Sequence, residues 1–156
     1  NGGGMVLTMG ATYPDYFAAL IPIAAPLTVD QSGIDKLKNQ PMWLIHTKAD
    51  TTVQPENSVL PLYKSLITSG ASNKWFSYFE TATGTDLPGT EYDGHWAWIY
   101  FFHDQVIGVQ HPENTKNWDG YSGMVATDPT NGGGSRASVN GQTYNSIFDW
   151  MSAQRH

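Results

Sequence analysis

The chain has 156 residues, of which 40% are hydrophobic and 14% charged, and its net charge is -6; these values fit a globular domain with a core of its own. The eight Lys and Arg residues are scattered singly, which excludes a surface that neutralises nucleic-acid phosphates, and no apolar run approaches the roughly 20 residues of a membrane-spanning helix. The absence of Cys excludes disulfides, Cys-ligated zinc and a thiol nucleophile.

The first forty residues predict one helix and one buried strand. Residues 2–12 carry apolar side chains at the spacing of a buried helix. The continuous apolar run 18–25 is typical of a strand buried on both faces, although Pro22 argues against pairing along its whole length. Residues 26–40 are expected to form a loop with one helical turn at 35–38.

The middle of the chain predicts two further strands with a helix between them. Residues 41–46 form a buried strand, and residues 56–69 place their large apolar side chains on one helical face. Pro61 lies inside that pattern, so the helix is expected to be kinked or to start late, and Gly70 is a natural stop. Residues 74–80 alternate and are rich in aromatic side chains, as a strand would be.

The last part of the chain predicts mostly irregular structure. Residues 81–94 are expected to be a loop, and residues 95–103 a helix. A long excursion rich in Gly, Asn, Thr and Asp covers 110–143, and a closing helix follows at 146–154.

Strands that alternate with helices at this spacing predict an α/β fold with a doubly wound, mostly parallel sheet. Three strands are too few for such a sheet. We therefore expect residues 1–156 to be the C-terminal portion of a single larger α/β domain, with an irregular insertion at about 104–143.

Two polar side chains follow the two best strands. Asp50 comes shortly after strand 41–46, and His95 lies in the loop after strand 74–80. In open parallel sheets, ligands collect at the carboxyl ends of the strands, so the two side chains can meet there. A carboxylate that holds an imidazole is the orienting half of a nucleophilic triad.

Five short sequence motifs, which follow one another in a fixed order along the chain, indicate where the nucleophile lies. The chain opens on Asn and three Gly before an apolar helix, like the part of a G-x-S-x-G elbow that follows its serine. With the later phrases, the chain resembles the second half of an α/β-hydrolase of the esterase, dienelactone-hydrolase and polyhydroxyalkanoate-depolymerase group. The matching positions are residues 1–4, 13–18, 21–26, Pro41, Trp43, His46, Asp50, Val53, Pro55, Ser58, Gly94, His95, Trp98 and the helix phrase 148–151.

This resemblance implies a carboxylic ester hydrolase. It makes Asp50 the triad acid and His95 the general base, with the serine just upstream of Asn1. The backbone N–H of Asn1 would be one oxyanion-hole donor, and a second would come from an earlier loop. Trp96 and Trp98 are candidates for walls of an acyl pocket, or for ordinary packing. No metal and no organic cofactor is needed.

The expected partners are a small or polymeric ester and the earlier segment of the same domain. We expect neither nucleic acid nor a membrane as a partner. The surplus of Trp, Tyr, Asn, Gly, Ser and Thr over Lys and Glu is typical of extracellular enzymes, so an extracellular location is expected.

Alternatives stay open. A peptidase of the prolyl-oligopeptidase type shares the triad and fold, and a non-catalytic hydrolase-fold binding module would lack the serine. Asp93 competes with Asp50 as the acid, but it is two positions from His95 in one loop. His46 ends a buried strand and is interpreted as a structural histidine. Ser122 in GYSG imitates an elbow, but no strand precedes it and no apolar helix follows it.

Overall fold

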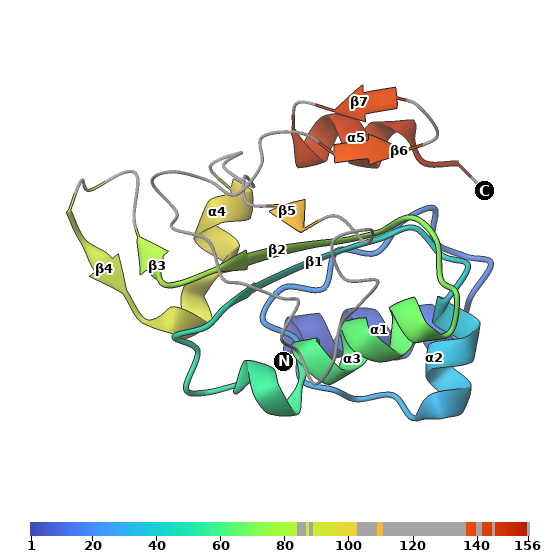
Figure 1. Cartoon of the computed structure of the whole chain (residues 1–156), viewed down its shortest axis with the longest axis horizontal. Coiled ribbons are helices and arrows are strands. Elements are labelled where there is room, and N and C mark those ends of the chain that lie inside the picture. The colour runs from blue at the N-terminus through green and yellow to red at the C-terminus, as the bar shows by residue number, and fades with distance from the viewer. Residues whose placement is uncertain are drawn as a thin grey trace.

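The computed structural model describes residues 1–83, 87, 89–102, 109–110, 137–139, 142–144 and 146–155. Its centre is a parallel pair of strands, β1 (Met42–Thr47) and β2 (Lys74–Phe79), which run side by side through the middle of the molecule (Figure 1). Every residue of both strands is buried. The predicted strands at 41–46 and 74–80 are therefore confirmed. A short strand, β5 (Val109–Gln110), extends the sheet antiparallel to β2.

The apolar segment at 18–25 pairs with β1 at two isolated points only. Parallel bridges join Leu20 to Met42 and Ile23 to Ile45. Between them Pro22 has no N–H to donate, and its carbonyl accepts from Ile45 N at 3.2 Å. The buried segment is therefore found beside β1, and its pairing is interrupted at Pro22, as the sequence predicts.

Helices cover both faces of this sheet (Figure 1). On one face lie α1 (Gly2–Thr12), α2 (Gln31–Leu37) and α3 (Val59–Thr68), and on the other lie α4 (Trp98–Phe102) and α5 (Ile147–Ala153). Alternate strand residues point to opposite faces. The first core cluster includes Leu7, Ile34, Leu44, Leu62 and Phe76, and the second includes Trp43, Ile45, Phe79, Tyr100 and Trp150.

The helices follow the sequence signals with one correction. The helices predicted at 2–12 and 146–154 are found as α1 and α5. The third predicted helix starts late, as Pro61 required: a 3₁₀ turn, η1 (Pro55–Asn57), precedes α3, and Pro61 falls in its first turn, where no N–H is needed. Residues 26–40 were expected to form a loop with one helical turn at 35–38, yet a longer helix, α2, forms at Gln31–Leu37. Its cap is Asp30, whose carboxylate accepts from Gly33 N at 2.9 Å.

The segment after β2 is more regular than expected. The predicted loop 81–94 contains an antiparallel pair, β3 (Ala82–Thr83) and β4 (Glu91–Tyr92), and a 3₁₀ turn, η2 (Gly94–Trp96), leads into α4. Within the predicted excursion, β6 (Ala137–Val139) pairs with β7 (Gln142–Tyr144). Most of the insertion predicted at 104–143, including Ser122, lies outside the described residues. In the described part, none of the helices has the length and apolar character that crossing a membrane requires.

Lys74, the first residue of β2, is fully buried. Its ammonium group donates to three backbone carbonyls, those of Lys38, Gln40 and Ser72. Lys38 is the C-cap of α2, so a cation lies at the negative end of that helix. Burial lowers the pKa of Lys74 from 10.5 to about 7.

Candidate active site

Asp50 lies in a tight turn directly after β1. The chain folds back so that one carboxylate oxygen, Oδ1, accepts from Thr52 N at 2.9 Å and from Val53 N at 2.7 Å. Asp side chains favour turns of this kind because they bond to backbone N–H groups two and three residues on. The carboxylate is buried, and its other oxygen, Oδ2, points away from the turn to two histidines.

The first of these is His95, in the η2 turn. Its Nδ1 lies 2.9 Å from Asp50 Oδ2, and because a carboxylate only accepts, Nδ1 carries the proton. The two predicted site residues are thus brought together from the ends of consecutive strands. Asp93 bonds the His95 backbone instead of its ring, accepting from His95 N at 2.8 Å.

Gly94 makes this meeting possible. A Cβ built on Gly94 would lie 2.3 Å from the carbonyl carbon and oxygen of Ala49 and 2.7 Å from Asp50 N, so only glycine lets the two loops touch. Thr47 holds the contact from the strand end, donating from Oγ1 to the Gly94 carbonyl at 2.6 Å. The η2 turn is therefore pressed against the turn that carries the acid.

The second histidine is His46, which is fully buried in β1. Its Nε2 lies 2.8 Å from the Val53 carbonyl oxygen and 3.2 Å from Asp50 Oδ2. Both partners are acceptors, so Nε2 carries the proton, and its N–H is shared between them. His46 was predicted to be structural, and nothing in its position within a buried strand indicates that it contacts the acid.

The hydrogen bonds decide the charge of the acid. Burial alone would raise the pKa of Asp50, because it penalises the charged form. Hydrogen bonds from His46, the Val53 N–H and His95 outweigh that penalty and lower the pKa to about 2. Asp50 is therefore a carboxylate at any pH at which an imidazole can act as a base.

A cavity of about 290 Å³ lies beside His95. Its walls come from the start of α1 (Asn1 to Gly3), from the segment around Ile23, and from His95 and Trp98. The amino-terminal end of α1, where backbone N–H groups have no helical partner, thus lines the same space as the imidazole. Because Nδ1 of His95 bonds to Asp50, Nε2 is the nitrogen left for chemistry in this cavity.

Close packing fixes the start of α1 at this position. A Cβ on Gly3 would lie 2.2 Å from the Ile23 carbonyl oxygen, so glycine lets the helix end approach the sheet edge. Ala24, which also lines the cavity, has φ of 46°, a left-handed conformation that is strained for a residue with a side chain. Strain of this kind concentrates at functional sites.

The two candidate tryptophans differ. Trp98 lines the cavity and meets the His95 ring edge to face, with centroids 5.6 Å apart. Trp96 is 44% exposed and lies between Tyr92 and Trp98, at centroid distances of 5.6 and 6.1 Å. An aromatic row therefore leads from the surface to the imidazole.

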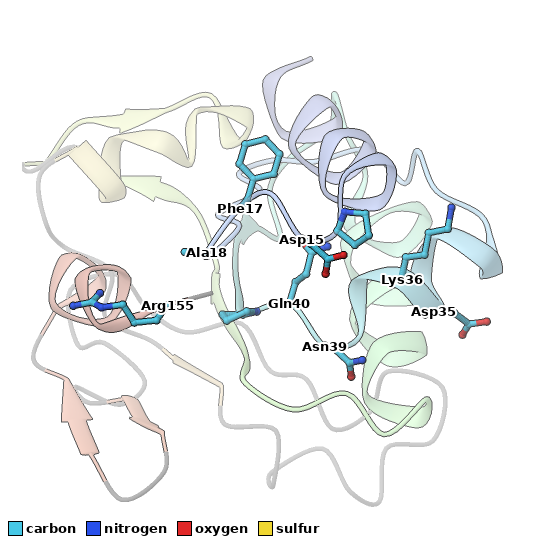
Figure 2. A pocket seen from close by; sticks show the side chains of 10 residues that line it. Asp15, Phe17, Ala18, Asp35, Lys36, Asn39, Gln40 and Arg155 are labelled. Carbon is cyan, nitrogen blue, oxygen red and sulfur yellow. The ribbon is translucent and has the colours of Figure 1, made fainter.

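A larger cavity, of about 580 Å³, lies elsewhere (Figure 2). Asp15, Lys36 and Arg155 are among the residues that line it. Pro41, which directly precedes β1, also lines it. It thus belongs to the amino-terminal end of β1, whereas Asp50 and His95 follow the carboxyl ends of the strands. Among the described residues, no group of three His, Asp or Glu side chains, the cluster around Asp50 included, is arranged to hold a metal ion.

Comparison with solved structures gives a match that bears on the function. No protein-family model and no curated protein matches the chain. Among solved structures, the chain is similar to a thermostable esterase, with 28% sequence identity and a TM-score of 0.55. The match covers 67% of this chain and 26% of the esterase, so the chain spans about a quarter of that protein's length. The likeness supports a relationship to hydrolase-fold esterases.

Proposed function

We propose that the intact protein hydrolyses carboxylic esters with a Ser-His-Asp triad. The serine immediately before Asn1 attacks the acyl carbonyl, and His95 takes the serine proton through Nε2. His95 then returns that proton to the leaving alcohol, and water repeats the cycle on the acyl-enzyme. Asp50 holds the imidazole tautomer and stabilises the imidazolium.

The observation that carries this proposal is the 2.9 Å contact between His95 Nδ1 and the Asp50 carboxylate, beside a cavity that the start of α1 also lines. A serine joined to Asn1 would begin at the helix end, which is where a nucleophile elbow presents its hydroxyl. The similarity to a thermostable esterase favours esters as the substrate class.

The developing oxyanion is assigned to the start of α1. The Asn1 backbone N–H has no partner within the helix, and the positive end of the helix dipole favours negative charge there. Trp98 forms the wall of the acyl pocket, and Trp96 lies at its outer edge. No metal and no organic cofactor takes part in this mechanism.

The proposal requires residues that this sequence does not contain. The nucleophile and the second oxyanion donor belong to an earlier part of a larger α/β-hydrolase domain, of which residues 1–156 supply the C-terminal portion. One side of the segment at 18–25 is occupied by β1, which in turn pairs with β2. The earlier part of the domain would therefore add parallel strands along the other side of this segment.

The test uses the full-length protein and p-nitrophenyl esters. His95→Ala should lower kcat/KM by several orders of magnitude, roughly 10³- to 10⁶-fold, because the triad acts as a unit. Near-normal turnover by this variant would end the assignment. Dipeptide amides, assayed alongside, distinguish the peptidase: a higher kcat/KM on amides than on esters would replace the esterase by it. Wild-type protein inert on both substrates would indicate the binding module.

A further inference from the structure

We infer that His46 is a positioning residue, which shares the Oδ2 oxygen of Asp50 with His95 and thereby sets the pH range in which His95 acts as a base. This inference rests on the proposed function, because it concerns the same acid and base.

Among the described residues, every polar contact of the His46 ring goes to the turn that carries the acid. Its Nε2 contacts the Val53 carbonyl at 2.8 Å and Asp50 Oδ2 at 3.2 Å, and its Nδ1 is buried without a partner in the described structure. A buried polar atom without a partner costs free energy. The ring is therefore oriented by the contacts of Nε2 to the turn that carries Asp50, and these contacts offset the free-energy cost of leaving Nδ1 without a partner.

These contacts clamp the acid turn from the strand side. Val53 donates its N–H to Asp50 Oδ1 at 2.7 Å, and its carbonyl accepts from His46. The Asp50 side chain thus closes the turn by accepting from the Val53 N–H, and His46 holds the turn to β1 by contacting the Val53 carbonyl. A carboxylate fixed in this way keeps Oδ2 aimed at His95, and misplacement of such a group by about 1 Å can cost about 10²-fold in rate.

The shared oxygen couples the two histidines. Oδ2 accepts from His95 Nδ1 at 2.9 Å and lies 3.2 Å from His46 Nε2, so its negative charge faces two N–H groups, and both histidines lower the pKa of Asp50. When the His46 N–H is removed, more of that charge faces His95, and the protonated form of His95 gains stability. The acid limb of the kcat/KM profile then moves to higher pH.

The other charged side chains near His46, Asp50 and His95 contribute little to the interaction between the two histidines. Asp93 bonds the His95 backbone and is exposed, and Lys48 pairs with Glu80 at 3.2 Å in a largely exposed salt bridge at the strand ends. Glu56, in η1 beside the acid turn, is also exposed. Screening by solvent makes these groups weak contributors compared with a buried hydrogen bond.

The test compares His46→Leu, which has no donor, with His46→Gln, whose amide can donate from nearly the same place. In the full-length protein we expect His46→Leu to lower kcat/KM by about 10- to 100-fold and to move the acid limb up by about 0.5 to 1 pH unit. His46→Gln should restore most of both. A His46→Leu profile that superimposes on wild type, or one that loses activity with an unmoved acid limb, would overturn the inference.

A measurement on wild-type protein covers the case in which His46→Leu does not fold. In ¹⁵N NMR of the histidine rings, the His46 Nε2–H resonance should shift as His95 titrates, because both protons bond to one oxygen. A resonance that stays constant through that titration would overturn the coupling. His95→Ala separates the two proposals: if it keeps full activity the esterase assignment fails, whereas if it is inactive and His46→Leu behaves as wild type, only the role of His46 fails.

Discussion

Replacing Gly94 by Ala should disable the site through one methyl group. The added Cβ would lie 2.3 Å from the Ala49 carbonyl atoms, and an ordinary contact there is at least 3.4 Å, so the η2 turn must retreat by about 1 Å. The neighbour is backbone, which cannot rotate away as a side chain can. His95 moves with Gly94, so its 2.9 Å contact to Asp50 would lengthen beyond hydrogen-bonding range.

We expect Gly94→Ala to lower kcat/KM for p-nitrophenyl esters by about 10²-fold or more, with a loss of about 1 to 3 kcal/mol in the free energy of unfolding. The matched control is Gly70→Ala. Gly70 has φ of 76° and open space around it, so that variant is strained but leaves the site intact. Ester hydrolysis by Gly94→Ala within a few-fold of wild type would refute the idea that the close approach positions His95.

Three other predictions use the full-length protein. Asp50→Asn should lower kcat by about 10⁴-fold, whereas Asp35→Asn, far from the site, should leave kcat unchanged. The pKa of Asp50 is lowered from 3.8 to about 2, so the ionised carboxylate stabilises the folded wild type by about 2 kcal/mol above about pH 4, and this stability is lost as the pH falls from about 4 to 2. Urea unfolding should show that Asp50→Asn lacks this pH-dependent stability. Wild-type stability should rise with pH between about 7 and 10.5, because there the unfolded chain binds the Lys74 proton that the folded chain releases, and Lys74→Met should remove this slope of up to about 1.4 kcal/mol per pH unit. Trp98→Ala should lower kcat/KM for bulky esters by more than Trp96→Ala, since only Trp98 lines the cavity; equal effects would contradict this.

Continuous patterns and special residues predict much of the fold. The core of β1 is a run of large apolar residues at 42–45, and Pro61 correctly marks the late start of α3. The misses come from short elements. α2 has seven residues, with a cap but only two large apolar side chains, so it depends on packing against α1 and α3. The pair formed by β3 and β4 has two residues in each strand, too few for a periodic signal.

The candidate site is predictable in part. Asp50 and His95 follow strands, and the topology of a parallel sheet brings strand ends together. The residues that hold Asp50 and His95 in place cannot be recognised in the sequence, because their role depends on contacts made only in the folded structure. His46 and Thr47 look like ordinary strand residues, yet one reaches Asp50 and the other reaches Gly94 across 47 positions of sequence. Lys74 likewise gives no hint in the sequence that its charge is buried among carbonyls.

The nucleophile is the part of the proposed triad that can be identified most directly. Full-length protein is treated with a fluorophosphonate, which reacts with activated serines, and the adduct is located by mass spectrometry. We predict one adduct, on a serine immediately before Asn1, which disappears in His95→Ala. An adduct on another serine such as Ser122, or ester hydrolysis that continues without any adduct, would contradict a triad built from Asp50, His95 and the start of α1.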